Sequence, residues 1–385
     1  MPSTSLLDVQ RLPALALKAE FVVPPQVFVP HERGIAFTFI GQDVLEIRPG
    51  ELWMFCHYGR KPTEFSPADM NYRQPPILKS YDGGRTWDGG TPMNLPWSSD
   101  GYLSDGGVSL LRLPGGRLVF VSHRYGTPYA CRGSHGVPVI SVSDDDGATW
   151  SPARLLHEHD GIYYVMNQRL VRLQSGRLVL PVSARDPRTA LDDYGEGLSP
   201  TISTCFLSDD EGESWRLGRE HVRQDTARGA QEPCVAEVSL GNLLMLFRSG
   251  RGYHQACWSK DGGETWTEPQ DTMLRAACSP LTLTTLPDGR LIVVYNHCEP
   301  QFLESYYPRN PLVYALSDDG GESWSEPVLI DDQPGQQLIY PSVTPLASGI
   351  LIVYCAAFAP GDGSFTFPTD AWSVGGGKRC VIKTP

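Results

Sequence analysis

One short frame occurs five times in the chain and constrains its fold more than any other feature. The frame is Ser-x-Asp-x-Gly-x-Ser/Thr-Trp, and its copies begin at Ser80, Ser143, Ser208, Ser259 and Ser317. Only the Ser, the central Asp, the Gly, the hydroxyl residue and the Trp recur in every copy. Because Ca²⁺ needs several oxygen ligands and the other acids change between copies, the pattern predicts a structural turn. We call this frame the Asp box and expect its aspartates not to be catalytic.

A second repeat alternates with the Asp boxes. Six short apolar runs are each opened by a Gly turn, at residues 48–55, 113–121, 173–182, 239–247, 286–295 and 346–354. They are rich in Val, Leu, Ile and aromatic residues and are too short for helices, so they indicate buried strands. The spacing leaves room for one four-stranded antiparallel sheet per repeat. The fold class predicted is therefore all-β, a six-bladed β-propeller with Asp-box turns.

The repeats continue along the chain without a linker, so we expect a single domain over residues 1–385. A propeller avoids an open sheet edge when a strand from one terminus joins the blade built by the other. Residues 19–29 are the candidate for that closing strand, and residues 369–383 could supply outer strands of the last blade.

The composition argues against several classes of partner. The formal net charge is −12, whereas nucleic acids and anionic membranes bind clustered basic surfaces, so we expect neither as a partner. The nine cysteines show no CxxC pair and no His spacing typical of zinc. We therefore expect reduced, buried thiols, no metal and no cofactor. No signal peptide or membrane-spanning run is evident, which predicts a cytoplasmic protein, although a chain trimmed of its leader would look the same.

Asp boxes on a six-bladed propeller resemble the sialidase (neuraminidase) superfamily, and the resemblance covers about residues 40–355. The strongest match is residues 231–250, where a Glu-Pro opens one strand and an Arg ends the next, just before the fourth Asp box. The resemblance implies that Arg248 binds the substrate and that Glu232 acts as a base. Arg248 ends an otherwise apolar run, where a guanidinium without a partner would be costly.

Two further segments resemble the family. Arg309, followed by x-Pro-Leu and a strand into the fifth Asp box, matches the place of another carboxylate-binding arginine. Arginine suits this role because its planar fork grips a carboxylate with two parallel bonds. Tyr340, upstream of a Ser and a Gly-turned strand, matches the place of the family's nucleophile. A neutral phenol can approach an anomeric carbon that carries a carboxylate, where a carboxylate nucleophile would be repelled.

The resemblance also implies an acid on a loop of the first blade, shortly before the first Asp box. Asp69 lies near the expected offset, and Glu64 is a rival in the same loop. Polar and aromatic loop residues are candidates for further contacts with the sugar, namely Arg60, Arg73, His123, His135, Tyr163, Asn167 and Gln168.

The chain departs from the family's pattern at one point. Sialidases normally present three arginines, and the place of the first falls near residues 40–42, where this chain has no arginine. Cys355 stands where the family often has a Glu that supports that arginine. Arg33, Arg60 or Arg73 could compensate from loops.

The residues together predict an exo-acting, retaining glycoside hydrolase of the sialidase type, which releases a terminal acidic sugar from a carbohydrate substrate. Two alternatives stay open. The first is a sialidase-like propeller acting on a uronic or arabinose-type sugar, as another exo-glycosidase or as a lyase that uses Tyr340 and a histidine. The second is a non-catalytic carbohydrate-binding propeller.

Overall fold

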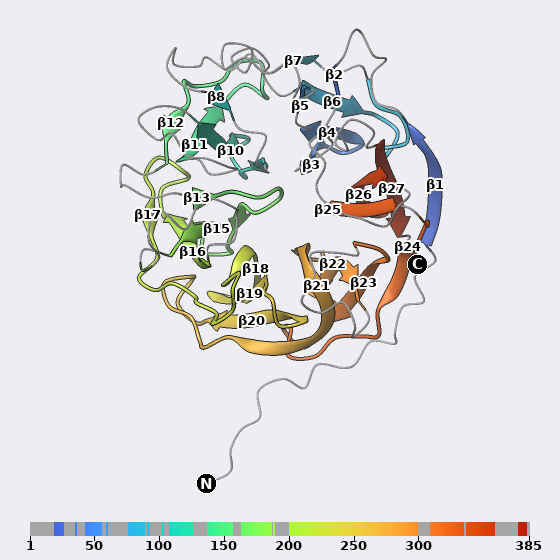
Figure 1. The fold of residues 1–385 in the computed structure, drawn as a ribbon. Coiled ribbons are helices and arrows are strands. Elements are labelled where there is room, and N and C mark those ends of the chain that lie inside the picture. The colour runs from blue at the N-terminus through green and yellow to red at the C-terminus, as the bar shows by residue number, and fades with distance from the viewer. Residues whose placement is uncertain are drawn as a thin grey trace.

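In a computed structural model the chain forms a ring of six antiparallel blades, a six-bladed β-propeller (Figure 1). The structure describes the chain except for residues 1–18, 27–34, 37–42, 56–58, 61–75, 89–90, 93–101, 104–107, 126–136, 157–162, 187, 189–199, 299–308, 335, 359–375 and 383–385. In the part that is described, no helix has both the length and the apolar character needed to cross a membrane.

The first three blades follow one another in chain order. Blade I contains β3 (Asp43–Arg48), β4 (Glu51–Phe55), β6 (Pro76–Ser80) and β7 (Thr91–Pro92), and β2 (Ile35–Ala36) pairs with β5 (Gly59–Arg60) in a separate small sheet. Blade II contains β8 (Tyr102–Leu103), β9 (Ser109–Arg112), β10 (Leu118–Tyr125), β11 (Val137–Ser143) and β12 (Arg154–Leu155). Blade III contains β13 (Tyr163–Tyr164), β14 (Val171–Arg172), β15 (Leu178–Arg185), β16 (Thr201–Ser208) and β17 (Arg216–Leu217).

Blades IV and V share one long strand, β21 (Gln270–Thr285). Its first part pairs with β20 (Tyr253–Ser259) of blade IV, and its second part pairs with β22 (Leu291–His297) of blade V. The other strands of these blades are β18 (Gln231–Ser239) and β19 (Asn242–Arg248) in blade IV, and β23 (Leu312–Ser317) and β24 (Val328–Asp331) in blade V. The outer strand of one blade thus continues directly into the inner strand of the next.

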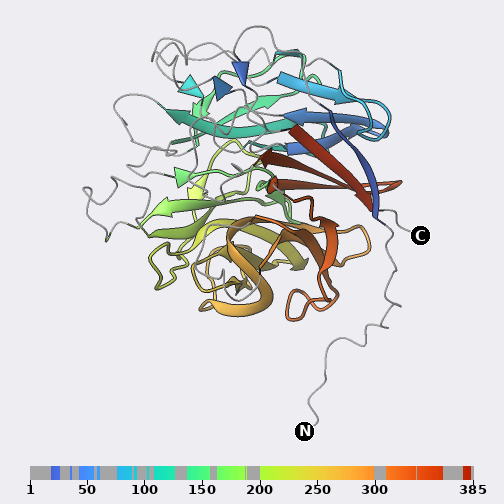
Figure 2. The same ribbon diagram turned by 45° about the vertical axis from the view of Figure 1, so that its right-hand side comes forward.

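Blade VI closes the ring. It contains β25 (Gln336–Leu346), β26 (Gly349–Phe358), β27 (Gly376–Ile382) and, from the start of the chain, β1 (Ala19–Gln26). The strand β1 pairs antiparallel with β27, from Ala19 opposite Ile382 to Gln26 opposite Gly377. It lies on the outer edge of the ring, where the first and last strands of the chain run side by side (Figures 1 and 2). This pairing leaves blade VI with four strands and joins the two ends of the repeat series.

The predicted apolar runs form the second strand of every blade, namely β4, β10, β15, β19, β22 and β26. The Gly turn before each run links the first strand to the second, and each Asp box follows the third strand. These two predictions from the repeats are confirmed. Arginines that follow the Gly turns bond to acids of the Asp boxes, as Arg117 does to Asp144 at 2.7 Å. Gly turns and Asp boxes therefore share one end of the ring, which we call the turn end.

Hydrogen bonds within each Asp box explain why its residues recur. In the first box the Asp82 carboxylate accepts the backbone N–H of Thr86 at 2.9 Å and the Thr86 hydroxyl at 2.7 Å. The Ser80 Oγ accepts the backbone N–H of Gly84 at 2.9 Å. Partial burial raises the pKa of Asp82, but the hydrogen bonds from Thr86 and Ser80 outweigh it and lower the pKa to about 2. The aspartate is thus held as an acceptor for its own turn, as the sequence predicted.

The tryptophan of each Asp box packs between blades. Six apolar clusters lie one at each boundary between consecutive blades. At the boundary of blades I and II, for example, Trp150 packs against Phe120 with ring centroids 6.0 Å apart. Five clusters contain an Asp-box tryptophan, and the cluster between blades V and VI has none because blade VI has no Asp box. The blades are therefore stabilised by apolar surface that neighbours share.

Substitution of Gly321 tests how closely neighbouring blades approach each other. It has φ +89°, and a Cβ on it would lie 2.3 Å from Leu244 Cδ2 of the preceding blade. We expect Gly321→Ala to lower the free energy of unfolding by about 1–3 kcal/mol through this overlap, beyond the cost of the left-handed backbone. Gly289→Ala is the matched control, because Gly289 has φ +88° and no atom within 4 Å of such a Cβ. Equal melting temperatures for the two variants would contradict tight contact between the blades.

Candidate active site

Four residues predicted from the sequence meet at one end of the central channel. Glu232 and Arg248 come from β18 and β19 of blade IV, Arg309 from the segment before β23 of blade V, and Tyr340 from β25 of blade VI. The Arg248 Nη2 lies 3.0 Å from the Glu232 Oε1. The Arg309 Cζ lies 5.7 Å from the centroid of the Tyr340 ring. One ion pair and one contact between a guanidinium and an aromatic ring thus come together from three blades.

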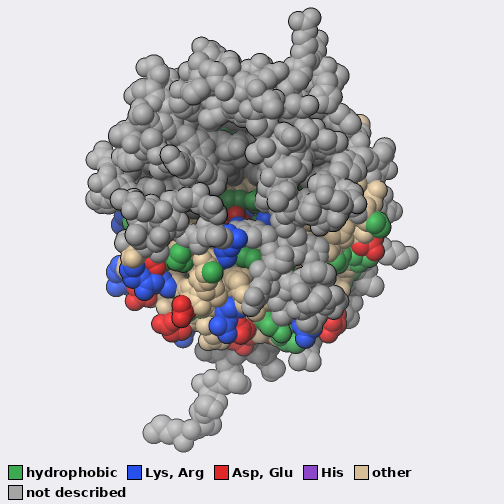
Figure 3. Space-filling view, viewed as in Figure 1, with side chains coloured by type: hydrophobic (Ala, Val, Ile, Leu, Met, Phe, Trp, Pro, Cys, Tyr) green, Lys and Arg blue, Asp and Glu red, His purple; other side chains and the backbone are tan. Residues whose placement is uncertain are grey.

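This site lies at the end of the ring opposite the turn end. Glu232 is at the start of the first strand of its blade and Arg248 at the end of the second, with the Gly turn between them. The two arginines and the glutamate are largely buried, with exposed fractions of 5% for Arg248, 1% for Arg309 and 9% for Glu232. The space-filling view shows a hollow at the centre of the ring, with acidic and basic side chains inside it (Figure 3).

The backbone at Glu232 and Tyr340 has an uncommon conformation. Their φ angles are +49° and +50°, and outside the Asp-box turns the only other described non-glycine residue with positive φ is Gln168. In both strands the pairing register shifts at this point, which marks a β-bulge. A proline, which has no backbone N–H, follows each of the two residues. Such strain costs about 1–3 kcal/mol per residue and is concentrated at functional sites.

The charges around Tyr340 keep its hydroxyl protonated. Burial raises the pKa of the phenol, and the negative charge of Glu232 raises it further. The positive charges of Arg309 and Arg248 and a hydrogen bond from Arg309 oppose this rise without cancelling it. The phenol is therefore neutral at neutral pH, with a carboxylate beside it to accept its proton and a guanidinium to stabilise the phenolate.

Neighbouring residues hold Arg309 and Glu232 in place. The Arg309 backbone N–H donates to Gln337 Oε1 at 2.6 Å, and the Arg309 carbonyl accepts the N–H of Leu338 at 2.8 Å. The Glu232 N–H donates to Ser183 Oγ of blade III at 2.6 Å. The second carboxylate oxygen, Glu232 Oε2, is buried and has no hydrogen-bond partner among the described residues. It is available to a ligand or to the Tyr340 proton.

Asn167 and Gln168 are predicted to contact the sugar. In the structure both side chains bond to the backbone of the strand that carries Tyr340. Asn167 Nδ2 donates to the Pro341 carbonyl at 3.0 Å. Gln168 uses both ends of its amide on Val343, accepting its N–H at 2.6 Å and donating to its carbonyl. Because these amides join blade III to blade VI across the channel, they brace the strand that carries Tyr340.

Tyr163, also predicted to contact the sugar, packs into the core between blades II and III. Its exposed fraction is 8%, and its ring is edge-on to Phe206 with centroids 5.0 Å apart. Burial raises the pKa of its hydroxyl. The loop composition predicts a stacking surface for a sugar, and the structure places the ring at the boundary between the two blades.

The other predicted site residues are described in part or not at all. Arg60 lies in β5 and His123 in β10, where only the backbone is described. Asp69, Arg73, Glu64 and His135 lie outside the described residues. Within the described part, no three His, Cys, Asp or Glu side chains are grouped closely enough to hold a metal ion.

Sequence reasoning missed Cys278, which lies at the floor of the site. Its exposed fraction is 1%, and its Sγ lies 3.7 Å from Gln231 Oε1. The six described cysteines are all buried and form no disulfide, namely Cys205, Cys234, Cys257, Cys278, Cys298 and Cys355. The sequence held a signal for Cys278. The tripeptide Cys-Ser-Pro stands in blade V at the place where blade IV has Gln-Glu-Pro and blade VI has Ile-Tyr-Pro.

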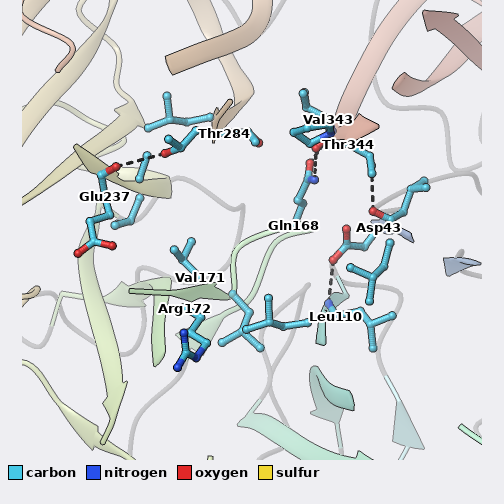
Figure 4. Close-up of a pocket in the computed structure, with 18 of the residues that line it drawn as sticks. Asp43, Leu110, Gln168, Val171, Arg172, Glu237, Thr284, Val343 and Thr344 are labelled. Carbon is cyan, nitrogen blue, oxygen red and sulfur yellow. Dashed lines mark hydrogen bonds between the residues drawn. The ribbon is translucent and has the colours of Figure 1, made fainter. Parts of the chain in front are cut away.

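Beyond the floor, the channel opens into a cavity of about 610 Å³ on the side of the turn end (Figure 4). Its walls come from the first strands of the blades, and Gln168 reaches across it to Val343. Asp43 lines the cavity, with an exposed fraction of 2%, and accepts the N–H of Leu110 at 2.8 Å. Burial raises the pKa of Asp43 to about 7, although hydrogen bonds from Leu110 and Val44 and the charge of Arg169 lower it.

Comparison with known proteins agrees with the propeller fold. A family model described as BNR repeat-like domain matches residues 106–353. A sialidase from Bacteroides fragilis (strain YCH46) is 27% identical over 281 residues, which cover 65% of this chain and 47% of the relative. The chain therefore spans about half the length of that curated relative.

Two solved structures show the same fold. A protein of unknown function from Dyadobacter fermentans DSM 18053 matches with a TM-score of 0.66 and 17% identity, covering 93% of this chain and 98% of that one. A Trypanosoma rangeli sialidase, solved in complex with 2,3-difluorosialic acid as a covalent intermediate, matches with a TM-score of 0.63 and 16% identity. That match covers 96% of this chain and 59% of the sialidase. At these identities the likeness establishes the fold.

The raised pKa of Asp43 predicts that the stability of the fold depends on pH. Its folded-state pKa of about 7 lies above the value of about 3.9 in an unfolded chain, so its stabilising effect is present below pH 4 and is lost as pH rises through 7. We expect wild type to lose stability relative to Asp43→Asn by about 2–3 kcal/mol between pH 5 and pH 8. Urea unfolding at both pH values measures this. Asp43→Ala, which also loses the Leu110 bond, should be destabilised at both, and a pH-independent gap for Asp43→Asn would contradict the prediction.

Proposed function

Because the chain belongs to the BNR repeat-like domain family, and because its site combines a phenol, a carboxylate and two guanidinium groups, we propose that it is an exo-acting, retaining glycoside hydrolase of the sialidase type. Its substrate is a carbohydrate with a terminal acidic sugar. The observation that carries the proposal is the convergence of Tyr340, Glu232, Arg248 and Arg309 at one buried site. A binding or scaffold propeller would have no need of an acid beside a half-buried, strained tyrosine.

The arginines provide the recognition. Arg248 and Arg309 bind the carboxylate of the sugar, and each charge-assisted hydrogen bond contributes about 1.5–3 kcal/mol. Both side chains are at least nine-tenths buried, so little water competes for them. Arg309 is fixed through its backbone by Gln337 and Leu338, which orients the bound sugar over the Tyr340 ring.

The chemistry proceeds in two displacements. In the first, the Tyr340 oxygen bonds to the anomeric carbon, its proton passes to Glu232, and the bond to the departing sugar oxygen breaks as an acid protonates that oxygen. Asp69 is the proposed acid. In the second displacement, Asp69 removes a proton from water, and the water oxygen attacks the anomeric carbon. The Tyr340 oxygen leaves that carbon and recovers its proton from Glu232. Two displacements at one carbon retain its configuration.

A second candidate is the same chemistry on a different acidic sugar, such as a uronic acid. The observation that favours it is the absence of arginine at residues 40–42, the place of the family's first carboxylate-binding arginine. A screen of aryl glycosides that includes sialic and uronic acids distinguishes the two candidates. The anomeric form of the first product, followed by NMR, reports retention, and an unsaturated product absorbing in the ultraviolet would indicate a lyase instead.

Tyr340→Phe tests the nucleophile directly. We expect kcat on the best aryl glycoside to fall by at least ~10³-fold while the sugar still binds, because the arginines are unchanged. Glu232→Gln should lower kcat by roughly 10²–10⁴-fold, the scale of lost acid–base catalysis.

Tyr354→Phe is the matched control. Tyr354 is fully buried in the core between blades V and VI and donates to Asp331 Oδ2 at 2.8 Å. Removing its hydroxyl should lower the melting temperature and leave kcat unchanged. Full turnover by Tyr340→Phe would exclude the proposed covalent step.

A further inference from the structure

One position of the repeat connects each blade to the next at the end of the ring that holds the site. Seven residues after the glycine of the Gly turn, blade III has Ser183, blade IV has Arg248 and blade V has Asn296. The Ser183 Oγ accepts the N–H of Glu232 in blade IV at 2.6 Å. The Arg248 Nη1 donates to the Cys278 carbonyl of blade V at 3.4 Å. Both side chains thus bond to the backbone of the next blade at the floor of the site.

Asn296 makes the corresponding contact with blade VI and one more. It lies in β22 and is fully buried. Its Nδ2 donates to the Leu338 carbonyl at 2.9 Å and, over the longer distance of 3.5 Å, to the Pro311 carbonyl. Leu338 comes two residues before Tyr340, and Pro311 comes two residues after Arg309. One amide group therefore contacts both of the chain segments that carry the facing guanidinium and phenol.

The peptide groups of Leu338 connect these two segments to each other. The Leu338 carbonyl accepts from Asn296, and the Leu338 N–H donates to the Arg309 carbonyl at 2.8 Å. The Arg309 guanidinium in turn lies 5.7 Å from the centroid of the Tyr340 ring. Because the backbone that carries a side chain limits where its polar end can lie, the bonds of Asn296 help to set the distance between guanidinium and phenol.

The surroundings of the Asn296 side chain require a hydrogen-bond donor. Both of its contacts are carbonyl oxygens, which only accept, and the amide supplies two N–H groups from one nitrogen. The other end of the amide, Oδ1, is buried without a partner among the described residues, which is unfavourable. An apolar side chain of the same size would avoid that cost but would lose both bonds. The amide is thus suited to holding the two carbonyls, and packing alone does not require it.

We propose that Asn296 is a positioning residue of the site. It fixes the segment of Arg309 against the strand of Tyr340, and it acts on the reaction through Arg309, which it holds where the acid group of the sugar binds. This inference rests on the proposed function, because it concerns the same site and the same reaction. If it is correct, the effect of changing Asn296 depends on the presence of the Arg309 guanidinium.

A double-mutant cycle with the full chain tests the proposal. The substrate is the aryl glycoside that wild type hydrolyses best, and high enzyme concentrations allow slow turnover to be measured. We expect Asn296→Leu to lower kcat/KM by ~10–10²-fold, the scale of a small displacement within a site. In the Arg309→Gln background the same change should lower kcat/KM by less than ~3-fold, because the residue that it displaces is already gone. A residue that acts only on stability would cause the same loss in both backgrounds.

Asn242→Leu is the matched control. The Asn242 amide donates to Ser239 Oγ at 2.7 Å within the Gly turn of blade IV, at the turn end, so kcat/KM should equal that of wild type. If Asn296→Leu does not fold, Asn296→Ser, which is smaller and admits water to the two carbonyls, replaces it in the cycle with the same pattern expected.

Two results overturn the inference and leave the proposed function in place. One is a kcat/KM of the Asn296 variant equal to that of wild type, and the other is an equal loss in the two backgrounds. If wild type hydrolyses none of the glycosides with an acidic sugar, the inference and the proposed function both fall.

Discussion

The propeller depends on apolar side chains that each blade shares with its neighbours. No described cluster belongs to one blade, since all six lie at boundaries between two. A ring built this way has a boundary left exposed unless the last blade meets the first, and here Val44 and Leu52 of blade I pack with Leu351 and Val353 of blade VI. The β1–β27 pairing adds a hydrogen-bonded closure to that packing. The position of every residue at the channel therefore depends on all six boundaries.

The strain at the candidate site is sustained by contacts across the channel. Tyr340 keeps its positive φ because the next carbonyl, Pro341 O, accepts bonds from Asn167 of blade III and Thr282 of blade V. Arg169, fully buried, bridges the same blades by donating to the Leu281 carbonyl at 2.9 Å. Bonds from two other blades fix the strand of the tyrosine before any ligand arrives. Preorganisation of this kind is what a nucleophile needs, because the cost of ordering is met during folding.

The sequence allowed the repeating parts of the fold to be predicted because the Asp box and the Gly turn are local. Their residues bond within a few positions of one another, as Asp82 and Thr86 do. The packing of Tyr163, Asn167 and Gln168 could not be predicted, because a polar or aromatic loop residue looks the same in the sequence whether it faces a ligand or the opposite side of the ring. The shared strand β21 could not be read from runs of apolar residues either.

The fold places the Asp-box carboxylates and the arginines of the candidate site at opposite ends of the ring. The Asp-box carboxylates lie at the turn end, where arginines pair with them. The Arg177 Nε, for example, donates to Asp209 Oδ1 at 2.6 Å. The guanidinium groups of the candidate site lie at the other end, on strands that begin or finish there. A net charge of −12 therefore says nothing about the sign of the central pocket. Long-range repulsion of an anionic ligand would be screened within about 8 Å at physiological salt, whereas buried arginines would act on it at contact distance, so the local charge decides what binds.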